Sequence, residues 1–203
     1  MKLFHSHASP FVRKCLVAAL ELGLQERIEI VSCNASPVNR NPEIAALNPL
    51  GKIPTLITDD GMVLYDSRVI CEYFDTLGNR RLIPAHGAAR FQALVLQSLA
   101  DGVNDAAILA RYEMALRPEP LRWSDWLTGQ LAKVTGALAE IERHAHEFGD
   151  RIDIGTIAVG AALGYLDYRH AALAWRENHP NTAAWFEWFD GRDSMVATKP
   201  PPA

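Results

Sequence analysis

The chain has 203 residues, of which 49% are hydrophobic and 22% are charged, and its formal net charge is -4. This composition is that of a globular protein with a substantial core, and it excludes a disordered chain. No run of Lys or Arg is long enough to follow a phosphate backbone, so we expect no nucleic-acid partner.

Neither a signal peptide nor a membrane anchor is predicted. The apolar start of the chain is interrupted at His5, before the core of a signal peptide could form. The longest strongly apolar stretch, residues 157–166, has about half of the ~20 residues that a membrane-spanning helix needs. We therefore expect a soluble, cytoplasmic protein that has no membrane partner.

The cysteines and histidines predict neither a disulfide framework nor a metal site. The three cysteines form no CxxC pair, which is typical of reduced thiols in the cytosol, and they are Cys15, Cys33 and Cys71. Two pairs of histidines are each two residues apart, but neither pair has a partner at a recognisable ligand spacing. We interpret all four as surface residues, and they are His5, His7, His144 and His146.

Residues 1–80 alternate short apolar strands with helical patterns. Asp60-Gly61 between two extended runs predicts a β-hairpin. Strands are expected at residues 2–5, 27–31, 55–58 and 63–65, and helices are expected at residues 10–22, 44–47 and 67–77. The resulting order β-α-β-α-β-β-α predicts a thioredoxin-like domain.

After a linker at residues 80–84 the strand signals disappear, and long helical patterns rich in Ala and Leu take over. After the first long helix, which two prolines end, helices are expected at residues 123–146, 153–168 and 182–190. The predicted fold is an α/β thioredoxin-like domain over residues 1–80, followed by an all-α helical domain over residues 86–203.

Two features of the helical half concern burial. Trp123 and Trp126 are three residues apart on one helix face, so we place both in the core. Asp101 and Asp105 are interpreted as solvated helix charges.

Ser9 follows the first expected strand and precedes Pro10 at the start of a helix. Proline suits the first helical position because the N–H that it lacks would be unpaired there. Ser9 is therefore expected to be the N-cap, and it could serve only in that role. Alternatively, its hydroxyl and the free N–H groups of the helix end could face an anion such as a thiolate.

Two further features lie in the same half of the chain. An Ile53-Pro54 bond in cis would cost only about 0.5–1 kcal/mol and would leave the backbone of Ile53 free to pair with a peptide. The alternative is an ordinary turn or edge-strand proline. Asp66 and Ser67 stand between a strand and a helix, where they serve either as an N-cap or as a site for the two charges of an amino acid end.

Together these features resemble the N-terminal domain of the glutathione S-transferase family, in which a helix-capping Ser, Tyr or Cys faces the glutathione sulfur. This sequence has Ser9, Ile53-Pro54 and Asp66-Ser67 in the corresponding places and order. The second half is similar to the helical domain of the family through residues 154–160 and 179–185. The resemblance covers nearly the whole chain, and the pattern is closest to a small bacterial branch.

The resemblance implies a glutathione transferase that uses glutathione as co-substrate, needs no metal and forms a homodimer. Ser9 would be the catalytic residue that stabilises the thiolate, with Ser6 a weaker candidate. The residues expected to bind the substrates are Phe11, Lys52, Ile53, Pro54, Asp66, Ser67, Ile108 and Tyr112. The second substrate, a small hydrophobic electrophile, would lie between the Ser9 loop and a helix on which four residues recur at helical spacing: Asn104, Ile108, Arg111 and Tyr112.

The sequence departs from the family pattern at three points. The buried helix of the family usually begins Ser/Thr-x-x-Asp, whereas here Asp153 stands first and Thr156 stands fourth. This exchange could disturb the geometry of the capping box at the start of the helix, which would affect stability rather than activity. Asp66 replaces the more usual Glu. No Tyr stands early in the chain and no Cys replaces Ser9, so the tyrosine-type and cysteine-type chemistries are disfavoured.

Other functions remain compatible with these residues. A protein of this fold could bind glutathione without turning over a substrate, since a shared fold does not establish activity. The bound thiolate could instead reduce peroxides. A glutathione-linked disulfide reductase fits less well, because Cys15 lies inside the first helix and is expected to pack in the core.

Overall fold

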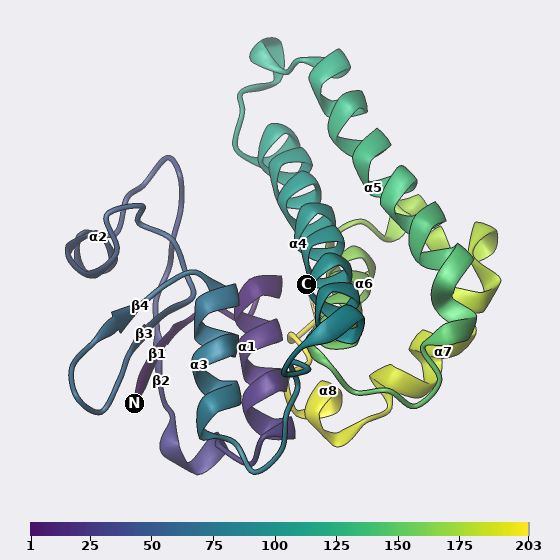
Figure 1. Cartoon of the computed structure of the whole chain (residues 1–203). Helices are drawn as coiled ribbons and strands as arrows, with labels where there is room; N and C mark the ends of the chain where they lie inside the picture. The colour runs from purple at the N-terminus through teal and green to yellow at the C-terminus, as the bar shows by residue number, and fades with distance from the viewer. Residues whose placement is uncertain (203) are drawn as a thin grey trace.

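Four short strands form one mixed sheet in the N-terminal part of the protein, which a computed structural model describes over residues 1–202 (Figure 1). The strands are β1 (Lys2–His5), β2 (Glu29–Ser32), β3 (Thr55–Ile57) and β4 (Val63–Leu64), in the order β2-β1-β3-β4. β1 pairs parallel to β2 and antiparallel to β3, and β3 and β4 form the expected hairpin. β2 begins later than expected because residues 25–27 form a short 3-10 turn.

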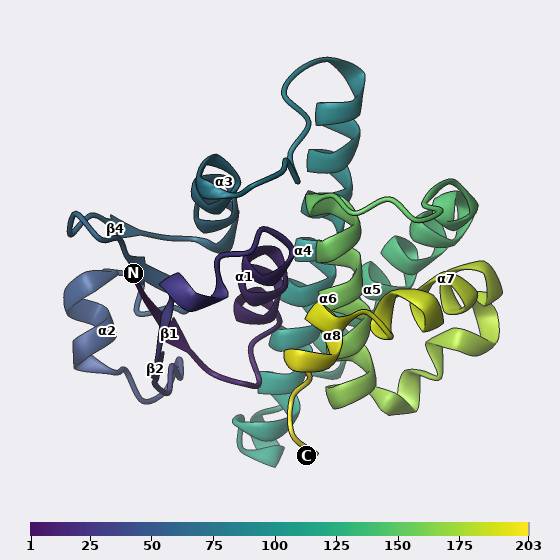
Figure 2. The same ribbon diagram turned by 90° about the horizontal axis from the view of Figure 1, so that it is seen from below.

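Three helices accompany the sheet: α1 (Pro10–Glu21), α2 (Pro42–Leu47) and α3 (Ser67–Leu77). α1 and α3 pack side by side on one face of the sheet, and α2 lies beyond its other face (Figures 1 and 2). The apolar residues of α1, α3 and the central strands form one core, whose fully buried members include Leu3, Leu22, Leu56 and Phe74. The predicted thioredoxin-like order of elements is confirmed.

The second half is helical: α4 (Gly87–Ala115), α5 (Ser124–His144), α6 (Ile154–Arg169), α7 (Pro180–Asp190) and α8 (Asp193–Ala197). α4 and α5 form a long hairpin, and α6 is buried between α4 and α1 (Figures 1 and 2). Two glycines permit this close packing. A side chain at Gly160 would meet the ring of Phe189, and one at Gly164 would meet the guanidinium of Arg13.

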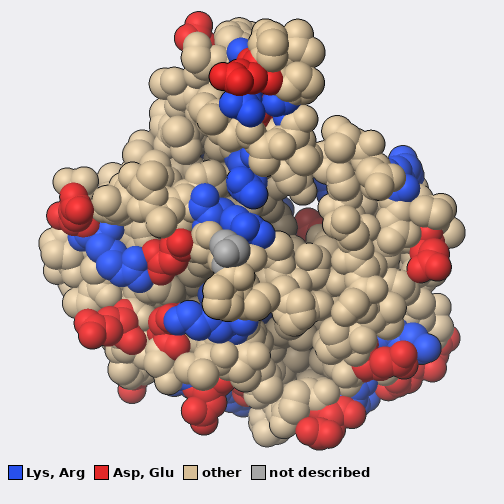
Figure 3. All heavy atoms as spheres, turned by 180° about the vertical axis from the view of Figure 1, so that it is seen from behind, with Lys and Arg blue, Asp and Glu red and all other residues tan. Residues whose placement is uncertain are grey.

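α4 is also the one helix within residues 1–202 that is long and apolar enough to cross a membrane by length and composition alone. Its mean hydropathy is 1.2 over an 18-residue window, half of which is buried inside the protein. Core helices of globular proteins commonly pass this test. The charged side chains on one face of the protein are of both signs, with basic groups toward the centre and acidic groups mostly at the margin (Figure 3).

The tip of the α4–α5 hairpin corrects one expectation. Trp123, which we placed in the core, is 62% exposed, and Trp126 is only partly buried. Both residues lie at the start of α5, where the hairpin projects beyond the other helices (Figure 1). The spacing of the two side chains identified a shared helix face, but no neighbouring element covers that face.

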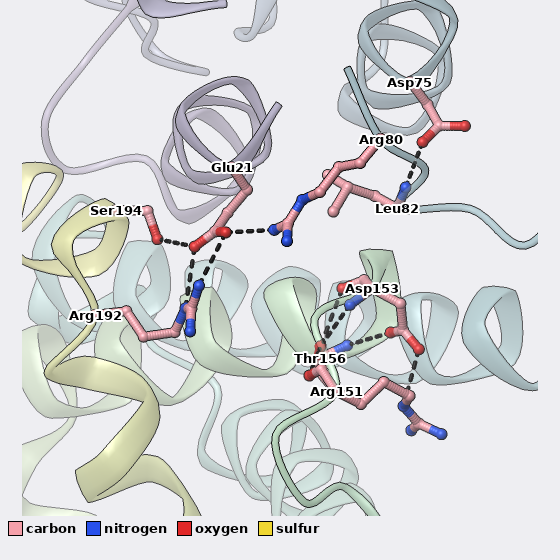
Figure 4. Close-up of polar contacts among 9 residues, drawn as sticks. All are labelled: Glu21, Asp75, Arg80, Leu82, Arg151, Asp153, Thr156, Arg192 and Ser194. Atoms are coloured by element: carbon pink, nitrogen blue, oxygen red, sulfur yellow. Dashed lines mark hydrogen bonds and ion pairs between the residues drawn. The ribbon is translucent and has the colours of Figure 1, made fainter. Parts of the chain in front are cut away.

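The start of α6 retains a full capping box despite the exchanged residues (Figure 4). The Asp153 carboxylate accepts a hydrogen bond from the Thr156 backbone N–H at 2.9 Å, and the Thr156 hydroxyl accepts one from the Asp153 N–H at 3.0 Å. Arg151 donates to the other carboxylate oxygen of Asp153 at 2.9 Å. The exchange of the two roles therefore leaves the capping geometry intact.

Helix α1 is held by residues from the linker and from the C-terminal end of the chain. Glu21, its last residue, accepts hydrogen bonds from Arg192 at 3.0 Å and from the Ser194 hydroxyl at 2.6 Å, and it also pairs with Arg80 (Figure 4). Arg13, on the same helix, is buried and donates to the Met195 carbonyl at 3.0 Å. The position of α1 thus depends on the helical half of the protein.

Candidate functional site

Ser9 lies half-buried in the turn between β1 and α1, and it is the N-cap of α1 as predicted. Its hydroxyl oxygen accepts a hydrogen bond from the Val12 N–H at 3.3 Å, and its own N–H donates to the Ser6 carbonyl at 3.0 Å. Within residues 1–202 the hydroxyl proton of Ser9 has no acceptor. The cap therefore leaves one donor available to a ligand at the positive end of the helix.

The Ile53-Pro54 bond is cis and directly precedes β3. The segment is fixed from within, since the Asn48 amide and the Thr55 hydroxyl both donate to the Lys52 carbonyl, at 3.1 and 2.9 Å. In the described part of the chain, the backbone of Ile53 forms no hydrogen bond to another backbone group. Its N–H and C=O are therefore available to an extended peptide.

Asp66 is the N-cap of α3, and its carboxylate accepts a hydrogen bond from the Arg68 N–H at 2.9 Å. The Asp66 side chain is exposed, whereas Ser67 is buried at the first helical position. Ser67 thus lies at the helix end while one carboxylate oxygen of Asp66 projects beside it without a partner in residues 1–202. A helix N-terminus, which favours an anion, thus lies next to a carboxylate, which favours a cation.

A hollow of about 400 Å³ adjoins the β1–α1 turn. It lies between the ends of β1 and β2 and the last turn of α6, and its lining residues are His5, Ser6, His7, Ala8, Ser32, Cys33 and Tyr168. A much smaller hollow of about 10 Å³ connects Ser9 with α6, where Gly164, Tyr165 and Tyr168 face it. Ser9 therefore lines the smaller hollow, which tyrosines of α6 close on one side.

Of the residues expected from sequence, only Ser9 and Ser6 line these two hollows. Ile108 and Tyr112 are half-buried on α4, Phe11 is half-buried on α1, and Lys52 is exposed. Burial raises the pKa of the Tyr112 hydroxyl.

Asn104 differs from the expectation that it faces the second substrate. The residue is fully buried, and neither its amide nitrogen nor its amide oxygen has a hydrogen-bond partner within residues 1–202. Asp101, which we interpreted as a solvated charge, is buried as well and pairs with Lys14. Helical spacing predicted one face of α4 but not the depth at which each residue lies.

The tyrosines of α6 were missed from the sequence. Tyr165 is almost fully buried, and burial is the main reason that its pKa rises to about 12. Tyr168 is partly buried and lines both hollows. α6 is apolar nearly all round, so its sequence carries no periodic signal that would single out a ligand-facing side.

The histidine prediction is wrong at one of its four positions. His5 is 4% exposed rather than a surface residue, and burial, followed by the nearby charge of His7, lowers its pKa. His5 is the last residue of the central strand β1, whose preceding residues Leu3 and Phe4 are also buried. Within residues 1–202 no group of three His, Cys, Asp or Glu side chains is arranged to hold a metal ion.

Two family models match this chain. Residues 8–77 match the model described as the N-terminal domain of glutathione S-transferase, and residues 124–187 match the model of the C-terminal domain. The uncharacterized GST-like protein YibF of Escherichia coli strain K12 is 33% identical over 207 residues, which cover 100% of both chains.

Solved structures extend the similarity to three dimensions. A glutathione transferase family member from Pseudomonas fluorescens Pf-5, with bound glutathione, has 47% sequence identity and a TM-score of 0.97 over 98% of each chain. A family member from the same organism with bound S-(propanoic acid)-glutathione has 47% identity and a TM-score of 0.92, over 99% of this chain and 100% of that one.

Proposed function

Because the chain belongs to the glutathione S-transferase family, we propose that it is a cytoplasmic glutathione transferase in which Ser9 activates the glutathione thiol for attack on a small hydrophobic electrophile. The observation that carries the proposal is the Ser9 hydroxyl, which caps α1, keeps its proton free of acceptors in residues 1–202 and lines the hollow of about 10 Å³ between the β1–α1 turn and α6. Detoxification of reactive compounds is the corresponding role.

Glutathione would lie along the edge of the thioredoxin-like domain. The backbone of Ile53, before the cis proline, would pair with the cysteinyl residue. Asp66 and Ser67 would bind the ammonium and carboxylate of the γ-glutamyl end. The exposed amine of Lys52 is available to the second carboxylate of the tripeptide. The glutathione bound to a relative with 47% identity supports this assignment.

In this proposal the Ser9 hydroxyl donates a hydrogen bond to the glutathione sulfur and favours its thiolate. A thiol with a pKa of ~8.5 is only about 3% ionised at pH 7. A hydrogen bond to the charged sulfur contributes roughly 1.5–3 kcal/mol, which lowers the thiol pKa by about one to two units. Part of the gain is lost because nucleophilicity falls with pKa, so most of the acceleration must come from holding the electrophile beside the sulfur.

The transfer step is a substitution or addition at carbon. With an aryl halide, the thiolate attacks the ring carbon, the carbon–sulfur bond forms, and the halide leaves with the electron pair of the broken bond. The thiol proton passes to solvent before the attack. Ile108 and Tyr112 of α4 and Phe11 of α1 would contact the electrophile, and the S-substituted glutathione bound to a relative supports a cleft that accepts a group on the sulfur.

The test compares Ser9→Ala with Ser6→Ala, since both hydroxyls lie in the same turn. We expect Ser9→Ala to lower kcat with 1-chloro-2,4-dinitrobenzene by about 10- to 100-fold while the Kd of glutathione by calorimetry changes by less than about twofold. Ser6→Ala should leave both constants nearly unchanged. An unaltered rate in Ser9→Ala, or a loss in Ser6→Ala instead, would remove Ser9 from the mechanism.

The wild-type protein also separates transferase activity from the two other functions compatible with the fold. Glutathione binding without turnover on a broad panel of electrophiles would identify a binding protein. Turnover of cumene hydroperoxide alone would identify a peroxidase.

A homodimer is part of the proposal. Apolar side chains of α3 and the first half of α4 are strongly exposed, with Val69, Phe91 and Val95 at 45%, 65% and 67%. Exposed apolar groups of this kind are typical of protein interfaces. Sedimentation should show a dimer that Val95→Asp shifts toward the monomer, and a monomeric wild-type protein would contradict this part of the proposal.

A further inference from the structure

His5 is a buried polar residue that lines the 400 Å³ hollow. Its side chain is 4% exposed, and its Nδ1 atom is shielded from water without a hydrogen-bond partner in residues 1–202. Nε2 also lacks a partner in this part of the chain, but it is not shielded, so it is the ring nitrogen that faces the hollow. The other shielded side-chain atoms without a partner belong to Gln97, Asn104 and Trp185, and none of these residues lines either hollow at the β1–α1 turn.

The surroundings of His5 indicate which ring nitrogen carries the proton. Burial, followed by the charge of His7, lowers the pKa of His5 below its ordinary value of 6.5, so the ring is neutral at pH 7 and carries one proton. Buried N–H groups without an acceptor are rarer in folded proteins than acceptors without a donor. A proton on Nε2 avoids such a group at Nδ1. His5 therefore presents a neutral N–H donor to the hollow.

The ring of His5 is held in place by its neighbours. His7 packs edge-on against it, with the ring centres 4.4 Å apart and the ring planes at 89°. His5 is also the last residue of β1, where its carbonyl accepts a hydrogen bond from the Cys33 N–H at 2.9 Å. A donor that is already held in position needs no rearrangement when charge develops on a bound ligand.

The hollow that His5 faces is polar but lacks acidic and basic side chains. Among the described residues, no Lys, Arg, Asp or Glu lines it. It adjoins the smaller hollow at Ser9, because three residues line both, and they are His7, Ala8 and Tyr168. A compound that reacts beside Ser9 and extends past this shared lining would reach the Nε2–H group of His5. An uncharged compound that accepts a hydrogen bond suits such a place.

We propose that the electrophile is an uncharged conjugated carbonyl compound, whose carbonyl oxygen accepts a hydrogen bond from His5 Nε2 in the 400 Å³ hollow. The inference rests on the proposed transferase function and names its substrate class. A conjugated carbonyl compound suits the arrangement because the carbon that the sulfur attacks and the oxygen that takes up the charge are opposite ends of one group. Ser9 would therefore act at one end and His5 at the other.

The reaction is an addition in which no group leaves. The glutathione thiolate attacks the β-carbon, the carbon–sulfur bond forms, and the electron pair of the carbon–carbon double bond shifts toward the carbonyl oxygen. The resulting enolate takes a proton from solvent at the α-carbon. His5 keeps its own proton, and its hydrogen bond strengthens as the oxygen gains negative charge, so His5 favours the transition state over the bound substrate.

Two conjugates test the hydrogen bond by calorimetry. S-(3-oxobutyl)glutathione and S-butylglutathione carry arms of the same length, and only the first arm has a carbonyl group. His5→Phe keeps an aromatic ring but removes the donor, and we expect it to lower the affinity for the ketone relative to the butyl conjugate by about fivefold. His5→Gln restores an N–H donor near the position of Nε2 and should recover most of this relative loss.

Kinetics provide a second readout. 4-Phenylbut-3-en-2-one is an uncharged conjugated ketone, whereas 1-chloro-2,4-dinitrobenzene has no carbonyl group. His5→Phe should lower kcat/KM for the ketone, relative to that for the aryl halide, by about 10- to 100-fold, mainly through kcat. His5→Gln should again recover most of the relative loss, which a purely structural role for the ring would not explain.

His144→Phe is the matched control, because it replaces an exposed imidazole of α5 that lines neither hollow. It should leave both ratios unchanged. Undiminished ratios in His5→Phe, or a loss in Tyr168→Phe without one in His5→Phe, would overturn the inference while leaving the transferase function intact. A wild-type protein that turns over neither compound would instead contradict the proposed function, together with the inference that rests on it.

Discussion

The ammonium nitrogen of Lys14 lies 2.7 and 2.8 Å from the two carboxylate oxygens of Asp101, and both side chains are almost completely buried. This pair joins α1, which carries Ser9 at its start, to α4. Arg68 of α3 donates to the same carboxylate at 3.0 Å. Removing two charges from water is costly, so the pair contributes more to the position of the helices than to net stability.

Removing either partner should be strongly and unequally destabilising. Asp101→Leu leaves the Lys14 charge buried without a carboxylate and should lower the free energy of unfolding by about 3–5 kcal/mol. Lys14→Met should cost less, because Arg68 still pairs with Asp101. The double variant Lys14→Met/Asp101→Leu should regain most of the loss in urea unfolding. A double variant as unstable as the sum of the two single variants would show that the two residues do not act as a pair.

The close packing of α6 predicts a sharp difference between two glycines. Gly160→Ala places a methyl group 2.6 Å from Cδ1 of Phe189, so the free energy of unfolding should fall by about 1–3 kcal/mol. Gly102→Ala, in an exposed and open part of α4, should instead stabilise the protein by about 0.5–1 kcal/mol. Thermal unfolding measures both, and equal midpoints for the two variants would contradict the packing of α6 against α7.

Glu142 caps the start of α7 from a distance in sequence, with its carboxylate accepting from the Asn181 and Thr182 N–H groups at 2.9 and 2.8 Å. Burial alone would raise the pKa of Glu142, but the hydrogen bonds from Thr182 and Asn181 outweigh it and lower the pKa below 4.5. The stabilisation is therefore complete above pH 4.5 and is lost as the pH falls through the lowered pKa of the folded state.

Glu142→Gln should accordingly reduce the free energy of unfolding by about 1–2 kcal/mol at pH 7. The difference from the wild type should shrink in denaturant titrations as the pH falls below 4.5. Glu187→Gln is the control, because Glu187 is exposed on α7 and has no hydrogen-bond or ion-pair partner within residues 1–202. A difference that persists unchanged at low pH would show that the charge of Glu142 is not the cause.

The cysteines should differ in accessibility. The sulfur atoms of Cys15 and Cys71 are 3.8 Å apart and buried in the core, and burial raises the pKa of the Cys15 thiol well above its ordinary value. Cys33 is partly exposed at the 400 Å³ hollow, and partial burial raises its pKa. Ellman's reagent should therefore modify one thiol slowly in the native protein and all three in denaturant. Modification of Cys33→Ser in its native state would contradict this arrangement.

Capping residues and prolines predicted the order of the elements well, because these short sequence features mark where helices begin. Ser9 before Pro10 marks the start of α1, and Asp66 marks the start of α3, as the structure confirms. Patterns fail where burial depends on distant parts of the chain. The charge of Asp101 is buried only because Lys14 approaches from α1, and Trp123 stays exposed because no element covers the hairpin tip.

The candidate site shows the same limit. Ser9, Ile53 and Asp66 could be identified because each belongs to a short motif with a local reason for its residue types. Tyr168 could not, because it reaches the β1–α1 turn only through the packing of α6 against α1. No pattern within α6 signals that contact.

The hydrogen bonds that Arg192 and Ser194 donate to the Glu21 carboxylate have a consequence for biosynthesis. Helix α1 is made before the helical half, yet its buried Arg13 acquires its side-chain partners, and Glu21 those beyond Arg80, only when residues 190–198 have been made. N-terminal domains commonly fold while translation continues. Here the turn that carries Ser9 would reach its final geometry only after residues 190–198 have been made, so a nascent chain would remain catalytically silent until then.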